Sequence, residues 1–205
     1  MVASQLRPSS VDDPRVVAAM ASVPRELFLP AELTAVAYRD TAIPVGAGRA
    51  VNAPLATGRL LTEAELAPGD HVLLIGAAAG YAAALLAGLV AQVVAVESDA
   101  RLFALAQAAL VATPNVLAIH ATLTEGHAAG APYDVLVIDG AVEEVPATLR
   151  DQLRVGGRVV TGLIEHGVTR LAAGVKTGSG FGLATFADAD CVHLPGFARP
   201  AGFRF

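Results

Sequence analysis

The sequence has a single cysteine and few charged residues. Cys191 has no second cysteine with which to form a disulfide within the chain, and it cannot supply a cysteine-only metal site. Charged residues make up 16% of the chain, compared with about 25% in an average soluble domain. The net charge is −5 and no cluster of lysine or arginine occurs, so the sequence lacks the basic footprint of a nucleic-acid-binding protein. A surface with little charge is compatible with self-association, which leaves a homo-oligomer open.

The histidines and the cysteine give no indication of a metal site or of a reactive nucleophile. No spacing typical of metal ligands relates the histidines, so we expect no metal; they are His71, His120, His127, His166 and His193. Cys191 lies in an apolar stretch that we interpret as a strand, where a thiol is expected to be inert core.

One long uncharged run raises the question of a membrane span. Residues 72–96 carry no charge, which is long enough to cross a bilayer. The run is better divided into strand, turn, helix and strand, because Gly76, Gly80, Gly88 and Gln92 fall where connections belong. The start, MVASQLRPSSVDDPR, has no apolar core typical of a signal peptide. We therefore expect a cytoplasmic protein with no membrane partner.

We predict a single domain over residues 1–205, with an N-terminal helical and loop extension at 1–68 and a Rossmann-like core at 69–205. The extension is predicted to hold a helix near 12–20, a short helix within VPRELFLPAEL, a loop-rich stretch at 38–54 and a helix at 55–66.

From His71 onward, apolar strand-like runs alternate with helical segments. Such alternation predicts an α/β fold with a doubly wound, mostly parallel sheet, since buried parallel strands have continuous apolar runs. Residues 168–194 differ, and a turn at Gly178–Gly182 predicts an antiparallel hairpin at the edge of the sheet. The predicted strands are 71–75, 92–97, 115–120, 134–138 and 157–163, and the predicted helices are 80–89, 99–111, 124–129 and 144–153.

The stretch LLIGAAAGY, residues 73–81, lies where an α/β protein places its cofactor turn. Glycines after the first core strand let a ligand approach the backbone. Glu97 ends the second predicted strand and could accept hydrogen bonds from ribose hydroxyls. The same residues also fit a tight contact between helix and sheet, beside a solvated acid, so this pattern alone leaves both interpretations open.

Several longer stretches resemble the protein-L-isoaspartate O-methyltransferase family, in the same order along the chain. They include DDPRVVAAMASVPRELFLP, AYRDTAIPVGAGRAVNAP, LTEAELAPGDHVLLIG, APYDVLVIDGA and LRDQLRVGGRVV. The resemblance covers about Gln5 to Val160. It implies a class I methyltransferase fold, S-adenosylmethionine as the methyl donor, and methylation of isoaspartyl residues in damaged proteins, a form of protein repair.

The resemblance also assigns expected roles to individual residues, and four positions depart from the family. Asn52 stands where the family has its serine at the methyl acceptor, and is the candidate catalytic residue. Leu74 stands at the position of an acid, and Thr122 at that of an aspartate facing adenine. Ala78 replaces the middle glycine of the turn, where a positive φ would strain an alanine or force a different turn. The expected cofactor-binding residues are Gly76, Ala78, Gly80, Tyr81, Glu97 and Thr122.

Asp139 is a further candidate, because it follows the fourth core strand at the end where ligands bind. It could contact substrate, although Asp139-Gly140 is also a favourable turn pair. Three functions remain open from the sequence. The chain is an isoaspartyl methyltransferase whose activity is weak or lost, a catalytically inactive homologue (a pseudoenzyme) that serves as a binding or interaction module, or a methyltransferase with another small-molecule acceptor.

Overall fold

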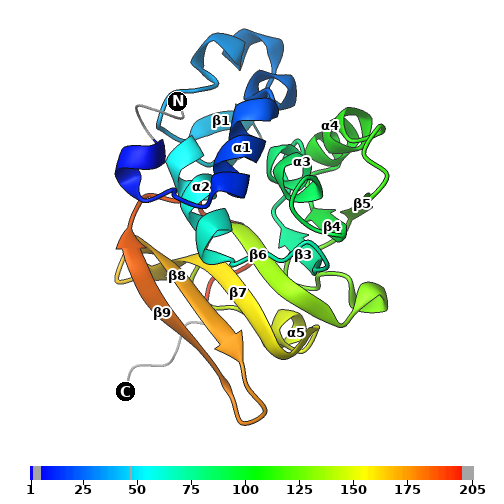
Figure 1. Cartoon of the computed structure of the whole chain (residues 1–205), viewed down its shortest axis with the longest axis vertical. Helices are drawn as coiled ribbons and strands as arrows, with labels where there is room; N and C mark the ends of the chain where they lie inside the picture. Colours follow the sequence, from blue (N-terminus) through cyan, green and yellow to red (C-terminus); the bar gives the residue numbers. More distant parts are fainter. Residues whose placement is uncertain (2–5, 47, 200–205) are drawn as a thin grey trace.

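A seven-stranded sheet forms the centre of the computed structural model, which describes residues 1, 6–46 and 48–199 (Figure 1). The strand order is β5-β4-β3-β6-β7-β8-β9, running from right to left in Figure 1. The five strands β5, β4, β3, β6 and β7 are parallel, and β8 and β9 are each antiparallel to the strand before them. The α/β class, the mostly parallel sheet and the antiparallel edge hairpin predicted from the sequence are thus confirmed. The strands are β3 (His71–Ile75), β4 (Gln92–Glu97), β5 (Val116–His120), β6 (Tyr133–Val142), β7 (Leu153–Glu165), β8 (Val168–Lys176) and β9 (Phe181–Asp188).

Alternate residues of the central strands point to two apolar clusters. Val72 and Leu74 of β3 join one cluster, to which α1 (Pro14–Ser22), α2 (Pro54–Glu63) and α3 (Tyr81–Ala87) contribute. Leu73 and Ile75 join the other, together with residues of α5 (Ala147–Arg150) and the C-terminal segment. Both faces of the sheet are therefore covered, which is why the strands are apolar throughout.

The N-terminal segment gathers at one end of the molecule, at the top of Figure 1. Two 3-10 helices, Arg25–Phe28 and Ala31–Val36, follow α1. The stretch predicted to be loop-rich contains one short antiparallel hairpin, β1 (Ile43–Gly46) and β2 (Arg49–Val51). Among the described residues, no helix is long and apolar enough to cross a membrane.

Two predicted helices differ from the structure. Residues 124–129 were expected to be helical, but Gly126 has φ 62° and only a 3-10 turn at Ala128–Gly130 forms. The helix expected at 144–153 is limited to α5. Pro146 disfavours helical backbone in the residue before it, so the helix starts only after this proline. The helix predicted at 99–111 is α4 (Ala100–Ala109).

Candidate functional site

The turn between β3 and α3 has left-handed backbone at three alternate positions. Gly76 has φ 80°, Ala78 has φ 47° and Gly80 has φ 101°. Ala78 therefore has the positive φ expected of the glycine that it replaces, and its methyl group adds strain without changing the course of the turn. Ala78 is buried against Val45, Val51 and Leu102.

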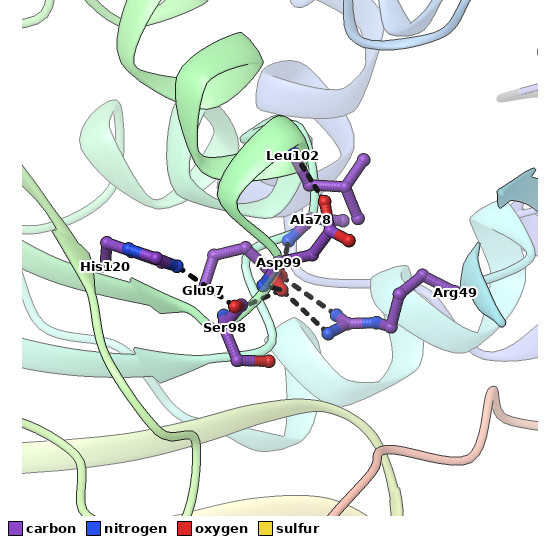
Figure 2. A network of polar contacts seen from close by, with 7 residues as sticks. All are labelled: Arg49, Ala78, Glu97, Ser98, Asp99, Leu102 and His120. Carbon is purple, nitrogen blue, oxygen red and sulfur yellow. Dashed lines mark hydrogen bonds and ion pairs between the residues drawn. The ribbon is translucent and has the colours of Figure 1, made fainter. Parts of the chain in front are cut away.

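Glu97, at the end of β4, is the centre of a polar network beside this turn (Figure 2). The backbone N–H of Ala78 donates to its Oε2 at 2.8 Å, and the N–H groups of Ser98 and Asp99 donate to Oε1 at 2.8 and 2.9 Å. Asp99 in turn caps α4 by accepting from the N–H of Leu102. The carboxylate is 1% exposed and has a fixed orientation.

Arg49 of β2 completes the network as a bidentate ion pair. Its Nη1 lies 2.7 Å from Glu97 Oε1, and its Nη2 lies 2.9 Å from Oε2. The guanidinium is itself buried, with 5% of the residue exposed, and reaches Glu97 from the hairpin side in Figure 2. Bidentate geometry of this kind is the strong form of the arginine–carboxylate contact.

A second polar cluster joins Asn52 to Asp139. Asn52 Nδ2 donates to Asp139 Oδ1 at 2.7 Å, and the Thr57 hydroxyl donates to the same oxygen at 3.3 Å. Burial raises the pKa of the Asp139 carboxyl above its ordinary value, although Asn52 and Arg25 oppose this shift. Asp139 does not form the turn that its sequence suggests. It lies within β6, where the pairing with β7 is irregular between Val137 and Ala141.

Arg25 supports the backbone at Asn52. Its Nε donates to Ala37 O at 2.8 Å, and its Nη2 donates to the backbone oxygen of Asn52. Its guanidinium also lies 4.8 Å from the centre of the Tyr81 ring, and burial raises the Tyr81 pKa to about 12. Tyr81, expected to bind a cofactor, is thus a buried partner of Arg25.

The C-terminal segment crosses the ends of β3 and β6. Ala141 N donates to Val192 O at 2.6 Å, and Leu194 N donates to Ala141 O at 3.0 Å. A Cβ placed on Gly76 would lie 2.9 Å from Leu194 Cδ1, and one placed on Gly140 would lie 2.5 Å from Leu194 Cγ. The Leu194 side chain therefore covers the first glycine of the turn.

The remaining predicted residues lie apart from these clusters. Leu74 is fully buried in the apolar cluster that includes the helices α1 to α3. Thr122 is exposed in the connection after β5. Cys191 is buried, as expected, but it lies in an irregular segment rather than in a strand, and burial raises the pKa of its thiol. No group of side chains suited to a metal ion occurs among the described residues.

A cavity of about 350 Å³ lies beside Asn52, next to the chain neighbour Ala53 and the hydrogen-bond partner Val192. Ala53, Cys191 and Val192 form part of its wall, and Val192 N donates to Asn52 Oδ1 at 2.8 Å. The cavity wall also includes three acids and no basic residue; the acids are Asp40, Asp188 and Asp190.

Sequence reasoning did not identify Arg25 or Arg49 as site residues. The available signal was an arginine within a mostly apolar stretch in each case, at VPRELF and GRAV. An arginine in such a place needs a buried partner, but the sequence does not show which acid provides it.

Comparisons with known proteins show which family the chain matches. Residues 1–189 match the family model of protein-L-isoaspartate(D-aspartate) O-methyltransferases. A protein-L-isoaspartate O-methyltransferase of Koribacter versatilis is 41% identical over 162 residues, covering 78% of this chain and 73% of that protein. A Rhodopseudomonas palustris relative, protein-L-isoaspartate O-methyltransferase 1, is 40% identical over 162 residues, with 78% and 66% covered.

Solved structures give the same fold. A protein-L-isoaspartate O-methyltransferase matches with a TM-score of 0.78 at 23% identity, covering 89% of this chain and 62% of the other. A beta-aspartate methyltransferase from Plasmodium falciparum, solved in complex with S-adenosyl-L-homocysteine, matches with a TM-score of 0.74 at 20% identity. That match covers 89% of this chain and 91% of the other.

Proposed function

The chain belongs to the protein-L-isoaspartate O-methyltransferase family, and on this premise we propose that it transfers a methyl group from S-adenosylmethionine to isoaspartyl carboxyls of proteins. The turn at Gly76–Gly80 carries the proposal. Its three left-handed residues hold the backbone around the Glu97 carboxylate, although the middle residue is alanine. A backbone this strained is retained where the surrounding structure requires it, which supports a binding role for the turn.

The side chains as they are arranged do not fit this donor. Both oxygens of Glu97 already accept hydrogen bonds from Arg49 and from the backbone, and Leu194 covers Gly76. The departures at Leu74 and Thr122 remove two further polar contacts that the resemblance implies. We therefore expect its binding to be weak.

The acceptor side of the site, around Asn52, can suit a substrate carboxylate although it contains an acid, Asp139. A substrate carboxylate near Asn52 would be repelled by an ionised Asp139. Burial raises the pKa of Asp139, which reduces this repulsion. The proposed role of Asn52 is to orient the acceptor side, since its amide is held by Asp139 and by Val192 N.

Methyl ester formation on synthetic peptides tests the proposal. An isoaspartyl peptide and its aspartyl twin are incubated with the protein and labelled S-adenosylmethionine, and the methanol released from the ester is counted. We expect label from the isoaspartyl peptide only. No label at a donor concentration that saturates the protein, measured by calorimetry, would overturn the proposal.

A second candidate, a non-catalytic binding or interaction module, is favoured by Leu74 and Thr122. The double change Ala78→Gly with Thr122→Asp restores two family residues at little cost to the core, because Thr122 is exposed and Ala78→Gly removes only one methyl group. Restored ester formation would indicate an enzyme site weakened by these substitutions. Tight binding of S-adenosylmethionine without any ester would favour the non-catalytic binding module. Leu74→Glu is unsuited to this test because it places a charge in the apolar cluster.

A methyltransferase with another acceptor is favoured by the acidic cavity beside Asn52. Asp188 is ion-paired with Arg170, so an attraction of this cavity for a cationic small molecule would come from Asp40 and Asp190. Competition settles the choice between the acceptors. Inhibition of ester formation by small amines, but not by carboxylates, would support the cationic acceptor.

A further inference from the structure

The β1–β2 hairpin brings a buried cation to the residue that would hold a nucleoside. This inference rests on the proposed function, because it concerns the donor site of that reaction. Arg49 is on β2 and Glu97 on β4, 48 residues apart, and the bidentate pair is their contact across the site (Figure 2). Both residues are nearly inaccessible to solvent.

The hydrogen bonds that Glu97 already accepts leave no lone-pair position for a further N–H or O–H group. Two come from Arg49 and three from the N–H groups of Ala78, Ser98 and Asp99. A carboxylate offers about four lone-pair positions. The vicinal hydroxyls of a ribose can therefore reach Glu97 only if Arg49 gives up its place.

We propose that Arg49 is the specificity-determining residue of the donor site, and that it competes with ribose hydroxyls for the Glu97 carboxylate. The three backbone donors belong to the turn and to the start of α4, so they hold Glu97 in place whether or not Arg49 is present. Withdrawal of Arg49 exposes an acid that is already oriented. A ligand without vicinal hydroxyls gains nothing from this withdrawal.

The hairpin that carries Arg49 packs on the turn and on α4 through a small set of contacts. Val45 and Val51 pack against Ala78 and Leu102 in a small cluster separate from the two main ones. Arg101 of α4 donates to the backbone oxygen of Val45. Gly46, with φ 94°, ends β1, and Gly48, with φ 70°, precedes β2.

Calorimetric titration with S-adenosylhomocysteine tests the competition. We expect Arg49→Ala and Arg49→Gln to bind about tenfold more tightly than the unchanged protein, since a hydrogen bond to a charged group is gained. Arg49→Lys keeps a cation beside Glu97 and should remain close to the unchanged protein. Arg59→Ala is the matched control, because Arg59 of α2 stacks on Phe186 and contacts Ser9 O, away from Glu97.

The chemical basis is tested with adenosine and 2′,3′-dideoxyadenosine. The gain on Arg49→Ala should appear for adenosine and vanish for the dideoxy compound. An equal gain for both compounds, or no gain for either, overturns the competition. Far-UV circular dichroism establishes that each variant is folded, and Arg49→Gln replaces Arg49→Ala if the alanine variant is not.

The outcomes separate this inference from the proposed function. Tighter, hydroxyl-dependent binding by Arg49→Ala supports the competition even when no isoaspartyl ester forms, in which case only the methyltransferase proposal fails. Ester formation by the unchanged protein, with affinities unaltered by Arg49→Ala, leaves the methyltransferase proposal standing and refutes the role of Arg49.

Discussion

The side chain of Asn52 connects Asp139 of the central strand β6 to the backbone of the C-terminal segment. Its Nδ2 donates to Asp139 Oδ1 at 2.7 Å, and its Oδ1 accepts from Val192 N at 2.8 Å. Each half of the amide therefore has a distinct partner, in a place where Asn52 is 1% exposed. A carboxylate at this position could accept from Val192 N but would have no N–H to donate to Asp139.

Asn52→Asp should destabilise the fold more than Asn52→Ala does. The aspartate puts a carboxylate against Asp139, while the alanine only removes the hydrogen bonds. We expect a loss of about 3 kcal/mol for Asn52→Asp, because a buried acid would be left unpaired, and about 1–2 kcal/mol for Asn52→Ala. Urea denaturation at pH 7 measures both values. Equal losses would mean that the second acid costs nothing beyond the lost hydrogen bonds.

Asp139 should make the stability of the protein fall as pH rises. Its pKa in the folded protein is raised above the ordinary value of 3.8 by burial, so the folded state holds the proton longer than the unfolded state does. Its stabilising contribution is complete below pH 3.8 and is lost as pH rises through the folded pKa. Within that window the unfolding free energy falls by about 1.4 kcal/mol per pH unit.

Asp139→Asn removes this titration and keeps an oxygen that can accept from Asn52 and Thr57. The stability of the variant relative to the unchanged protein should therefore increase from pH 4 towards neutral pH. Urea denaturation of both proteins across this range gives the difference directly, since all other titrating groups cancel. A difference that is constant with pH would show that Asp139 titrates alike in both states.

Ala78→Gly should stabilise the protein, in contrast to the same change at its neighbours. Ala78 has φ 47°, and left-handed backbone costs a non-glycine residue about 1–2 kcal/mol. After the extra entropy of a glycine in the unfolded chain, a net gain of about 0.5–1 kcal/mol remains. Ala77 and Ala79 lack a positive φ, so Ala77→Gly and Ala79→Gly should each lower the thermal midpoint. A lower midpoint for Ala78→Gly as well would mean that its packed methyl outweighs the strain.

The sequence was sufficient for the core strands because these strands are buried on both faces. The runs at His71–Ile75 and Gln92–Glu97 are continuous, apolar and bounded by turn residues, and they match β3 and β4 residue for residue. The strain at Ala78 was one of two outcomes that the sequence left open, the other being a different turn, and the structure shows the left-handed backbone.

The two polar pairs of the site were not predictable, because packing alone creates them. Arg49 and Glu97 are 48 residues apart, and Asn52 and Asp139 are 87 apart, with no local pattern linking either pair. Asp139-Gly140 has the composition of a turn, yet tertiary contacts override this preference. Pairing with β7 resumes at Ala141, whose N–H also bonds to Val192 O, and so β6 continues through the predicted turn.

Gly140→Ala should loosen the C-terminal segment over the site. A Cβ at residue 140 would lie 2.5 Å from Leu194 Cγ and 2.8 Å from Val192 O, so the segment must shift. We expect a loss of about 1–3 kcal/mol, as for overpacking elsewhere, and faster proteolysis within residues 189–199. Gly182→Ala, on the edge strand β9 with nothing within 4 Å of its Cβ, is the control and should change neither property.

Leu194→Ala distinguishes a steric effect on this segment from a general effect on β6. Truncation of Leu194 removes the nearest atoms that a new Cβ at residue 140 would meet, so the double variant Gly140→Ala with Leu194→Ala should lose less stability than the two single losses added together. The coupling is read from urea denaturation of the four proteins in the cycle. Strict additivity would place the strain of Gly140→Ala on the Val192 carbonyl instead. In that case Leu194 would cover Gly76 without fixing the position of the segment.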